Sequence, residues 1–218
     1  MEETEIEELL AEAVRAFRLL PRGIGVSQII SAITDHAVIP LDGSIEDTKL
    51  LDSISVAATN LIAVSQNEPI KTKRLNELGN AVEEPMLAAC IRAGLSATWP
   101  KRSNGTASRT GYPDIALAID GPRPTYLEAK VIGAGSEGSS FRSFYLSPSD
   151  NPKVCADARH LLVAFTHERR PDSTDGFEQY ALTNFKIVDL ARVLGKIKFE
   201  YQASNKDMYV GDAVVVGE

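Results

Sequence analysis

Two short apolar runs, at residues 114–119 and 126–132, limit most strongly how this chain can fold. Asp120-Gly121-Pro122 lies between them and supplies turn residues, and apolar runs bounded in this way are typical of β-strands. We therefore expect the two runs to form an antiparallel hairpin.

The residues before this hairpin have the apolar period of helices. We expect helices over residues 6–17, 26–36 and 45–64, with Ser44 as the N-cap of the third. The period continues over residues 71–93, where Pro85 either kinks the helix or lies in the first turn of a second one. Gly94 is a natural end for this segment.

Beyond Gly94 the pattern changes to short apolar runs. We expect an extended segment at 95–99, a polar loop at 101–111, strands at 141–146, 160–166 and 180–188, a short helix at 153–158 and another helix beginning near Asp189. This order predicts the α/β class, bordering on α+β, with a central mixed sheet flanked by helices. We expect one domain, 1–218, made of an N-terminal helical region (1–70) and a core (71–218).

Composition excludes several classes of protein. The N-terminus is acidic where a secretory signal is basic, and no apolar run is long enough to span a membrane, so we expect a cytoplasmic protein. Cys90 and Cys155 are too few for a disulfide framework or a thiolate zinc site. The net charge of -7 argues against a protein that coats nucleic acid non-specifically. However, 11 acidic residues lie within the first 52, so the rest of the chain is closer to neutral and could form a basic groove.

The hairpin carries charges in unusual places. Asp114 follows Pro113 at the start of the first run, and Glu128 and Lys130 lie two apart in the second, so both side chains point to one face of the strand. Isolated buried charges are costly, and a divalent cation held by the carboxylates would relieve that cost. Carboxylate-bound Mg²⁺ suits phosphodiester hydrolysis. The alternative is that a Glu-x-Lys triplet within a strand is an ordinary one.

The role of each residue follows from this chemistry. The Asp114 and Glu128 carboxylates and the Ala129 backbone carbonyl are the expected metal ligands. Lys130 is expected to orient or help deprotonate the attacking water, or to stabilise the negative charge that develops on the phosphate oxygens.

The order of these motifs resembles the PD-(D/E)XK nuclease superfamily, whose members have a strand ending in Pro-Asp, a hairpin and a strand with Glu-x-Lys. The segment from Gly79 to Gly94 is similar to the first core helix of that family, and on that pattern Glu83 is a further catalytic acid. Glu84 is the alternative, because Pro85 leaves the helical phase open, and both could be solvated helix acids. The resemblance implies a restriction-endonuclease-like core.

Within the superfamily, the chain looks most like a type II restriction endonuclease. The similar stretches are Gly111-Tyr112-Pro113-Asp114, the segment 139–148 and the segment 157–165. The resemblance implies a homodimer that uses Mg²⁺, for which Mn²⁺ can substitute, and that cuts double-stranded DNA at a specific sequence, leaving 5′-phosphate and 3′-hydroxyl ends. A cognate DNA methyltransferase is then expected in the same cell.

DNA contacts are expected from basic and amide side chains near the metal-binding strands. The candidates are Lys101, Arg102, Ser103, Asn104, Arg109, Arg142 and Lys153; the alternative for each is a solvated loop residue. Two rival functions are a DNA repair or junction-resolving nuclease with the same core, and a DNA-binding protein without catalysis. The retained Asp114, Glu128 and Lys130 argue against the second rival.

Overall fold

The structure is a computed structural model that describes residues 3–118, 121–139, 144–171, 173, 176–198, 203–210, 212 and 214–216. By its internal contacts the chain divides into two compact units, Gly25–Val193 and the pair of terminal segments Met1–Ile24 and Leu194–Glu218. The single nuclease domain expected over 1–218 stays a prediction, as does its division near residue 70.

The unit of terminal segments is built on the helix α1 (Glu3–Leu19), none of whose residues is buried. It also contains the short helix α5 (Asn205–Tyr209), whose first turn is capped by the Ser204 hydroxyl. The strand β1 (Ile24–Gly25) pairs with β8 (Leu194–Gly195) in a two-stranded sheet. Within the described residues, no helix of either unit is long and apolar enough to cross a membrane.

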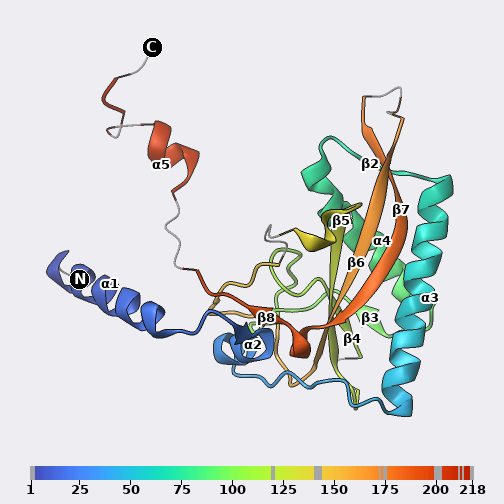
Figure 1. The fold of residues 1–218 in the computed structure, drawn as a ribbon, viewed down its shortest axis with the longest axis horizontal. Coiled ribbons are helices and arrows are strands. Elements are labelled where there is room, and N and C mark those ends of the chain that lie inside the picture. The colour runs from blue at the N-terminus through green and yellow to red at the C-terminus, as the bar shows by residue number, and fades with distance from the viewer. Residues whose placement is uncertain are drawn as a thin grey trace. The chain divides into compact units, whose positions relative to one another are not determined.

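The unit Gly25–Val193 is organised around a six-stranded mixed sheet with the strand order β2-β7-β6-β5-β4-β3 (Figure 1). β5 and β6 run parallel, and every other neighbouring pair runs antiparallel. The strands are β2 (Ile70–Thr72), β3 (Ala97–Thr98), β4 (Ile115–Leu117), β5 (Thr125–Gly133), β6 (Arg159–Arg170) and β7 (Glu178–Asp189). This arrangement confirms the expected mixed sheet.

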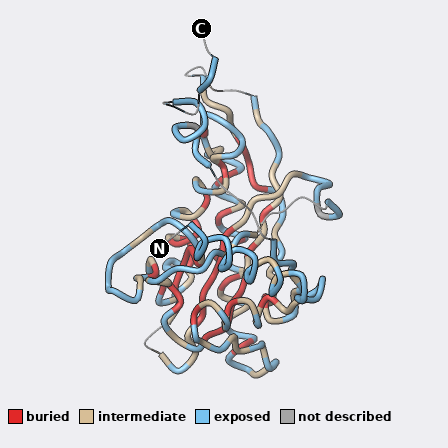
Figure 2. Tube along the Cα trace, turned by 90° about the vertical axis from the view of Figure 1, so that its left-hand side faces the viewer, coloured by how far each residue is buried: buried red, intermediate tan, exposed pale blue. Residues whose placement is uncertain are grey.

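Helices flank the sheet, and α3 (Ile45–Asn67) and α4 (Leu78–Arg92) cover one of its faces (Figure 1). On this face α3 and α4 enclose the main core with inward residues of the central strands, such as Leu127, Leu161 and Phe165. On the other face α2 (Val26–Thr34) packs near the 3₁₀ turn Leu190–Arg192, where Ile30 and Leu190 are buried. Figure 2 shows the buried segments gathered along the strands of this unit.

Local sequence explains several element ends. The Ser44 hydroxyl accepts from the Asp47 N–H and starts α3, as expected from an N-cap. At the end of α4 the N–H of Leu95 donates to Cys90 O and that of Gly94 donates to Ile91 O, and Gly94 has a φ of +84°. This is a glycine C-cap of the Schellman type. Pro85 lies inside α4, which remains one continuous helix.

The hairpin and most other elements are confirmed. β4 and β5 pair antiparallel with Ile115 opposite Leu127, and β6 and β7 contain the runs expected at 160–166 and 180–188. The expected helices at 6–17, 26–36 and 45–64 correspond to α1, α2 and α3.

Four local predictions were wrong. The start of the helix expected over 71–93 is instead the end of β2 followed by the 3₁₀ turn Leu75–Glu77, because residues 70–72 pair with β7. No helix forms at 153–158, and the described part of the expected strand 141–146, residues 144–146, is not a strand. After Asp189 the chain makes only a 3₁₀ turn, which the Asp189 carboxylate caps by accepting from Ala191 N–H. A further 3₁₀ turn, Ser136–Gly138, follows β5.

A buried ion cluster ties α3 to the sheet. Asp47 is only 1% exposed, and its Oδ1 accepts from Arg123 Nη1 at 2.9 Å and lies 2.6 Å from Arg159 Nε. Its other oxygen accepts from the Asp42 N–H at 2.7 Å. Arg123 precedes β5 and Arg159 opens β6, so this carboxylate fixes the starts of the two parallel strands.

The outer edge of β7 is occupied by side chains where β2 ends. β2 pairs only with residues 178–180, but further along β7 the Leu182 N–H donates to the Ser65 hydroxyl at 2.9 Å. The Gln66 side-chain amide donates to Leu182 O at 2.6 Å. Beyond that, the Phe185 N–H donates to the side-chain oxygen of Asn184. Two residues of α3 and one of β7 itself thus use backbone groups that a further strand would need.

Candidate active site

The hairpin brings the three expected residues together. Asp114 directly precedes β4, and its Oδ2 accepts from the Ala129 N–H at 2.9 Å. On β5 the Lys130 ammonium lies 2.5 Å from Glu128 Oε1. The Asp114 and Glu128 side chains are almost completely buried, while that of Lys130 keeps 28% exposure. The site therefore combines two buried carboxylates with one ammonium that reaches solvent.

Strand alternation explains why these charges do not enter the main core. Leu127 and Ala129 belong to the main core under α3 and α4, whereas Tyr126 belongs to a second cluster with Ala116 and Val154. Because successive side chains of a strand point to opposite faces, Glu128 and Lys130 lie on the Tyr126 face. The expectation that Glu128 and Lys130 share a face is confirmed.

Burial and neighbouring charges shift the ionisation of this group. Burial and the Asp114 carboxylate raise the pKa of Glu128 to about 7, even though Lys130 opposes the shift. Burial lowers the pKa of the Lys130 ammonium, but Glu128, Asp114 and Glu83 outweigh it and leave the pKa above its ordinary value. Lys130 therefore stays positively charged at neutral pH. The ionised form of Glu128 is destabilised by its burial and by the nearby Asp114 carboxylate.

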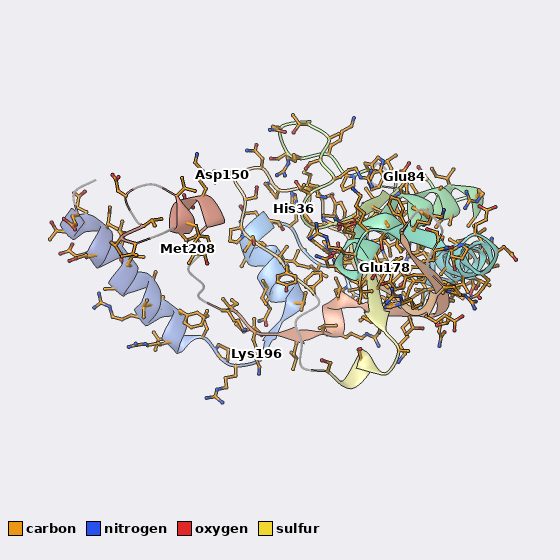
Figure 3. The ribbon with its side chains drawn as sticks, turned by 90° about the horizontal axis from the view of Figure 1, so that it is seen from above. His36, Glu84, Asp150, Glu178, Lys196 and Met208 are labelled. Atoms are coloured by element: carbon orange, nitrogen blue, oxygen red, sulfur yellow. The ribbon has the colours of Figure 1, made fainter. Side chains whose placement is uncertain are left out.

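Of the two candidate acids on α4, Glu83 faces the site. Its side chain is 12% exposed, and burial together with the Asp114 carboxylate raises its pKa, against the opposing effect of Arg109. The Glu84 side chain is 72% exposed and is labelled at the surface of α4 in Figure 3. Arg109 lies 3.9 Å from the Glu83 carboxylate and 3.4 Å from that of Glu84. The same guanidinium stacks over the Trp99 ring at 4.6 Å from its centroid.

The sequence analysis did not place Tyr112 or His160 in the site. The Tyr112 hydroxyl lies 2.5 Å from His160 Nδ1, and burial together with Glu128 and Asp114 holds the tyrosine pKa well above its ordinary value. Burial lowers the pKa of His160 to about 4, so this imidazole is neutral near pH 7. Tyr112 therefore stays protonated beside the carboxylates. The only signal in the sequence was an aromatic residue directly before Pro113-Asp114.

The expected DNA-contact residues fall into separate groups. Lys101, Ser103 and Asn104 are exposed in the loop before β4, where the Asn104 side-chain oxygen accepts from Thr106 N–H and hydroxyl groups. Arg102 is tied into the protein, because it donates to Asn151 O and to the Ser108 hydroxyl, both at 3.1 Å.

Of the remaining candidates that the structure describes, only Lys153 differs from an exposed position: the Arg109 side chain is 53% exposed. Arg109 is paired with the acids of α4. Lys153 is only 3% exposed. Arg142 lies outside the described residues. A DNA contact by any of the seven stays a prediction.

The arrangement offers hard oxygen ligands beside cationic groups. Among the residues that the structure describes, no group of three or more His, Cys, Asp or Glu side chains converges closely enough to hold a metal ion by itself. Two carboxylates can still bind a divalent ion whose remaining ligands are water, a backbone carbonyl or a substrate oxygen. An anionic substrate would find Lys130 beside them.

The raised pKa of Glu128 predicts a pH-dependent stability difference. A carboxyl group whose pKa is higher in the folded state than in the unfolded state stabilises the protein at low pH, and this contribution is lost as pH rises through the folded value. Without metal, Glu128→Gln should have nearly wild-type stability at pH 5 and be more stable than wild type by ~1–3 kcal/mol at pH 8. Urea unfolding in EDTA measures both values. Glu84→Gln, at an exposed position of α4, should show no such difference, and equal behaviour of the two variants would contradict the assignment.

Comparisons with known proteins agree with one another. The family model described as "Type II restriction enzyme MjaV family" matches residues 20–212. The curated protein "Type II restriction enzyme MjaV" of Methanocaldococcus jannaschii is 33% identical over 227 aligned residues, which cover 97% of this chain and 94% of that protein. No solved structure matches the chain.

Proposed function

This chain belongs to the MjaV family of type II restriction enzymes and is therefore a sequence-specific DNA endonuclease, and we propose that it cleaves double-stranded DNA with Mg²⁺ at a site formed by Asp114, Glu128 and Lys130. The products would carry 5′-phosphate and 3′-hydroxyl ends. The observation that supports the site is the pairing of β4 with β5, which places the Asp114 carboxylate on the Ala129 N–H beside the Glu128–Lys130 ion pair. This is the arrangement expected for a PD-(D/E)XK nuclease.

The residues present fit a divalent cation. Type II restriction enzymes generally use divalent metal ions, and among the described residues the buried Glu128 Oε2 has no hydrogen-bond partner. A buried carboxylate oxygen without a partner is costly unless a cation occupies that position. Asp114, Glu128 and the Ala129 carbonyl would hold Mg²⁺, with Mn²⁺ as a substitute. When bound, the ion supplies Lewis-acid activation of water and stabilisation of negative charge.

The protein groups have separate roles in this proposal. Lys130, which keeps its charge and reaches solvent, would orient the water or stabilise the negative charge that develops on the phosphate. The raised pKa of Lys130 makes it a poor acceptor for a proton, so its charge is the more useful property. Glu83 would serve as a further acid that faces the same region from α4.

The family also supports proposals about partners. A homodimer with two-fold symmetry would present one cleavage site to each strand of a palindromic sequence. Because the host DNA contains the same site, a cognate DNA methyltransferase would protect it in the same cell. Both proteins would act in the cytoplasm, where they meet DNA.

The direct test incubates purified protein with mixed-sequence double-stranded DNA in Mg²⁺ or in EDTA. Discrete fragments should form only with Mg²⁺, and end mapping should give the recognition site and the end chemistry. Asp114→Asn should remove cleavage while leaving DNA binding measurable, and Asp150→Asn, on an exposed loop, should cleave like wild type. Discrete cleavage in EDTA, or full activity of Asp114→Asn, would refute the metal site. Cutting confined to branched DNA would favour a junction-resolving nuclease.

A further inference from the structure

A pocket of about 280 Å³ lies in the unit Gly25–Val193, and its lining includes Tyr112, two residues before Asp114. The end of α2, the loop at 110–112 and the segment at 145–154 provide its lining. Tyr112 connects the pocket to the site, since this residue lines the pocket and its pKa is raised in part by Glu128 and Asp114. The pocket is therefore close to the groups that are proposed to cleave DNA.

The wall of this pocket contains a buried lysine. Lys153 is 3% exposed, and its ammonium contacts Ser108 O at 3.4 Å, a weak hydrogen bond. Among the described residues no carboxylate lies within 4.0 Å of this ammonium, although Asp114, Glu128 and Glu83 act on it from farther away. Burial of an ammonium without a close counter-charge is costly, so this position calls for an anionic partner.

The neighbouring polar groups fit a phosphate. Thr110, Ser147 and Ser149 also line the pocket and carry hydroxyl groups that can donate to phosphate oxygens. Arg102 also lines the pocket, but its guanidinium already donates to Asn151 O and to the Ser108 hydroxyl. We therefore assign Arg102 to the wall of the pocket and not to phosphate binding. Lys153 also lines the pocket, and its ammonium has N–H groups left to donate to a ligand. A lysine binds phosphate as a compact point charge.

We propose that this pocket binds one backbone phosphate of the cleaved DNA strand and that the Lys153 ammonium is the charge partner of that phosphate. The proposal rests on the DNA endonuclease function above and goes beyond it, because it assigns a positioning residue outside the Asp114, Glu128 and Lys130 set. The competing explanation is that Lys153 only offsets the nearby carboxylates. The two explanations differ in how DNA binding responds to salt and to the loss of a single phosphate charge.

The first experiment measures DNA binding in EDTA, so that no cleavage occurs, with a duplex that contains the mapped site. Each phosphate neutralised by the protein contributes about 0.9 to the slope of log affinity against log salt concentration. Lys153→Met should lower this slope by about 0.9, and Lys153→Arg should keep most of it. Lys49→Met removes the same charge from an exposed position on α3 and should leave the slope unchanged.

The second experiment replaces single phosphates of the cleaved strand by uncharged methylphosphonates. With the wild-type protein, one position should weaken binding about tenfold, and the same substitution should have no further effect on Lys153→Met. An unchanged salt slope, or a phosphate profile that is the same in both proteins, would overturn the proposal in favour of carboxylate neutralisation. If Lys153→Met does not fold, as judged by its thermal transition, Lys153→Gln takes its place.

The two experiments distinguish a failure of this inference from a failure of the proposed function. Lys153 would be confirmed as a phosphate ligand by binding alone, with no cleavage step. If wild type binds and cleaves but the Lys153 variants match it in slope and profile, only this inference fails. If wild type never cleaves in Mg²⁺, the proposed function fails, and the salt slope measured on a duplex of mixed sequence still decides the role of Lys153, because this slope counts phosphate contacts and needs no mapped site.

Discussion

Lys130→Ala should reduce the rate of Mg²⁺-dependent DNA cleavage by about 10²–10³-fold, the range found when a charge-stabilising donor is removed from an active site. The ammonium of Lys130 is the one cation within hydrogen-bond distance of Glu128 among the described residues, and its raised pKa keeps it charged at neutral pH. Single-turnover cleavage of the mapped site measures the effect. DNA affinity in EDTA should change by no more than a few-fold, since Lys130 would act on the reacting phosphate.

Two controls make this result specific. Lys130→Arg keeps the charge but changes its shape, and it should retain more activity than Lys130→Ala. Lys186→Ala removes a lysine from β7 and should cleave at the wild-type rate. Cleavage by Lys130→Ala at the wild-type rate would exclude Lys130 from the catalytic centre.

Asp47→Ala should lower the free energy of unfolding by about 3–5 kcal/mol, the cost of leaving a buried charge without its partner. The substitution removes the carboxylate that binds both Arg123 and Arg159, of which the Arg159 side chain is 5% exposed. Because these arginines lie at the starts of β5 and β6, the pairing of the two parallel strands should weaken with them. Urea denaturation, followed by far-UV circular dichroism, measures the loss.

Glu46→Ala is the matched control for this effect. Glu46 also pairs with Arg123, at 3.5 Å, but its side chain is 60% exposed. An exposed ion pair contributes only about 0–1 kcal/mol. Similar destabilisation by the two substitutions would show that the buried position of Asp47 is not what matters.

Elements with local signals were predictable from the sequence. α3 has a capping serine and an uninterrupted apolar period, and the β4–β5 hairpin has turn residues between two apolar runs. Both signals depend on residues close together in the chain. That Glu128 and Lys130 point to the same face of β5 was predictable for the same reason, because it follows from the alternation of side chains along one strand.

Elements set by distant contacts were not predictable. Residues 71 and 72 were expected to begin a helix but belong to β2, because residues 70–72 pair through their backbone with residues 178–180. The segment 153–158 is held in a non-helical path by the Tyr126 hydroxyl, which accepts from the Cys155 N–H at 2.9 Å, and by backbone pairing of Ala158 with Ala37. Such contacts join parts of the chain whose spatial proximity no short pattern reveals.

The residues of the candidate site also include some that could be placed from local sequence and some that could not. Asp114, Glu128 and Lys130 could be placed together from one hairpin. The choice of Glu83 over Glu84 required the helical phase through Pro85, and the burial of Lys153 required the packing of loops from three parts of the chain. Sequence reasoning treated Lys153 as one of several basic residues, because burial cannot be read from a lysine with polar neighbours.

The occupied edge of β7 has a consequence for how copies of this protein meet. An open strand edge is a template on which a second chain can add, and it promotes aggregation. Here the Ser65 hydroxyl and the Gln66 amide occupy the backbone groups of Leu182, and the outermost strands, β2 and β3, span only three and two residues. Two molecules therefore gain little by continuing the sheet from one to the other. A pair of molecules assembled on DNA should therefore meet through helices and loops.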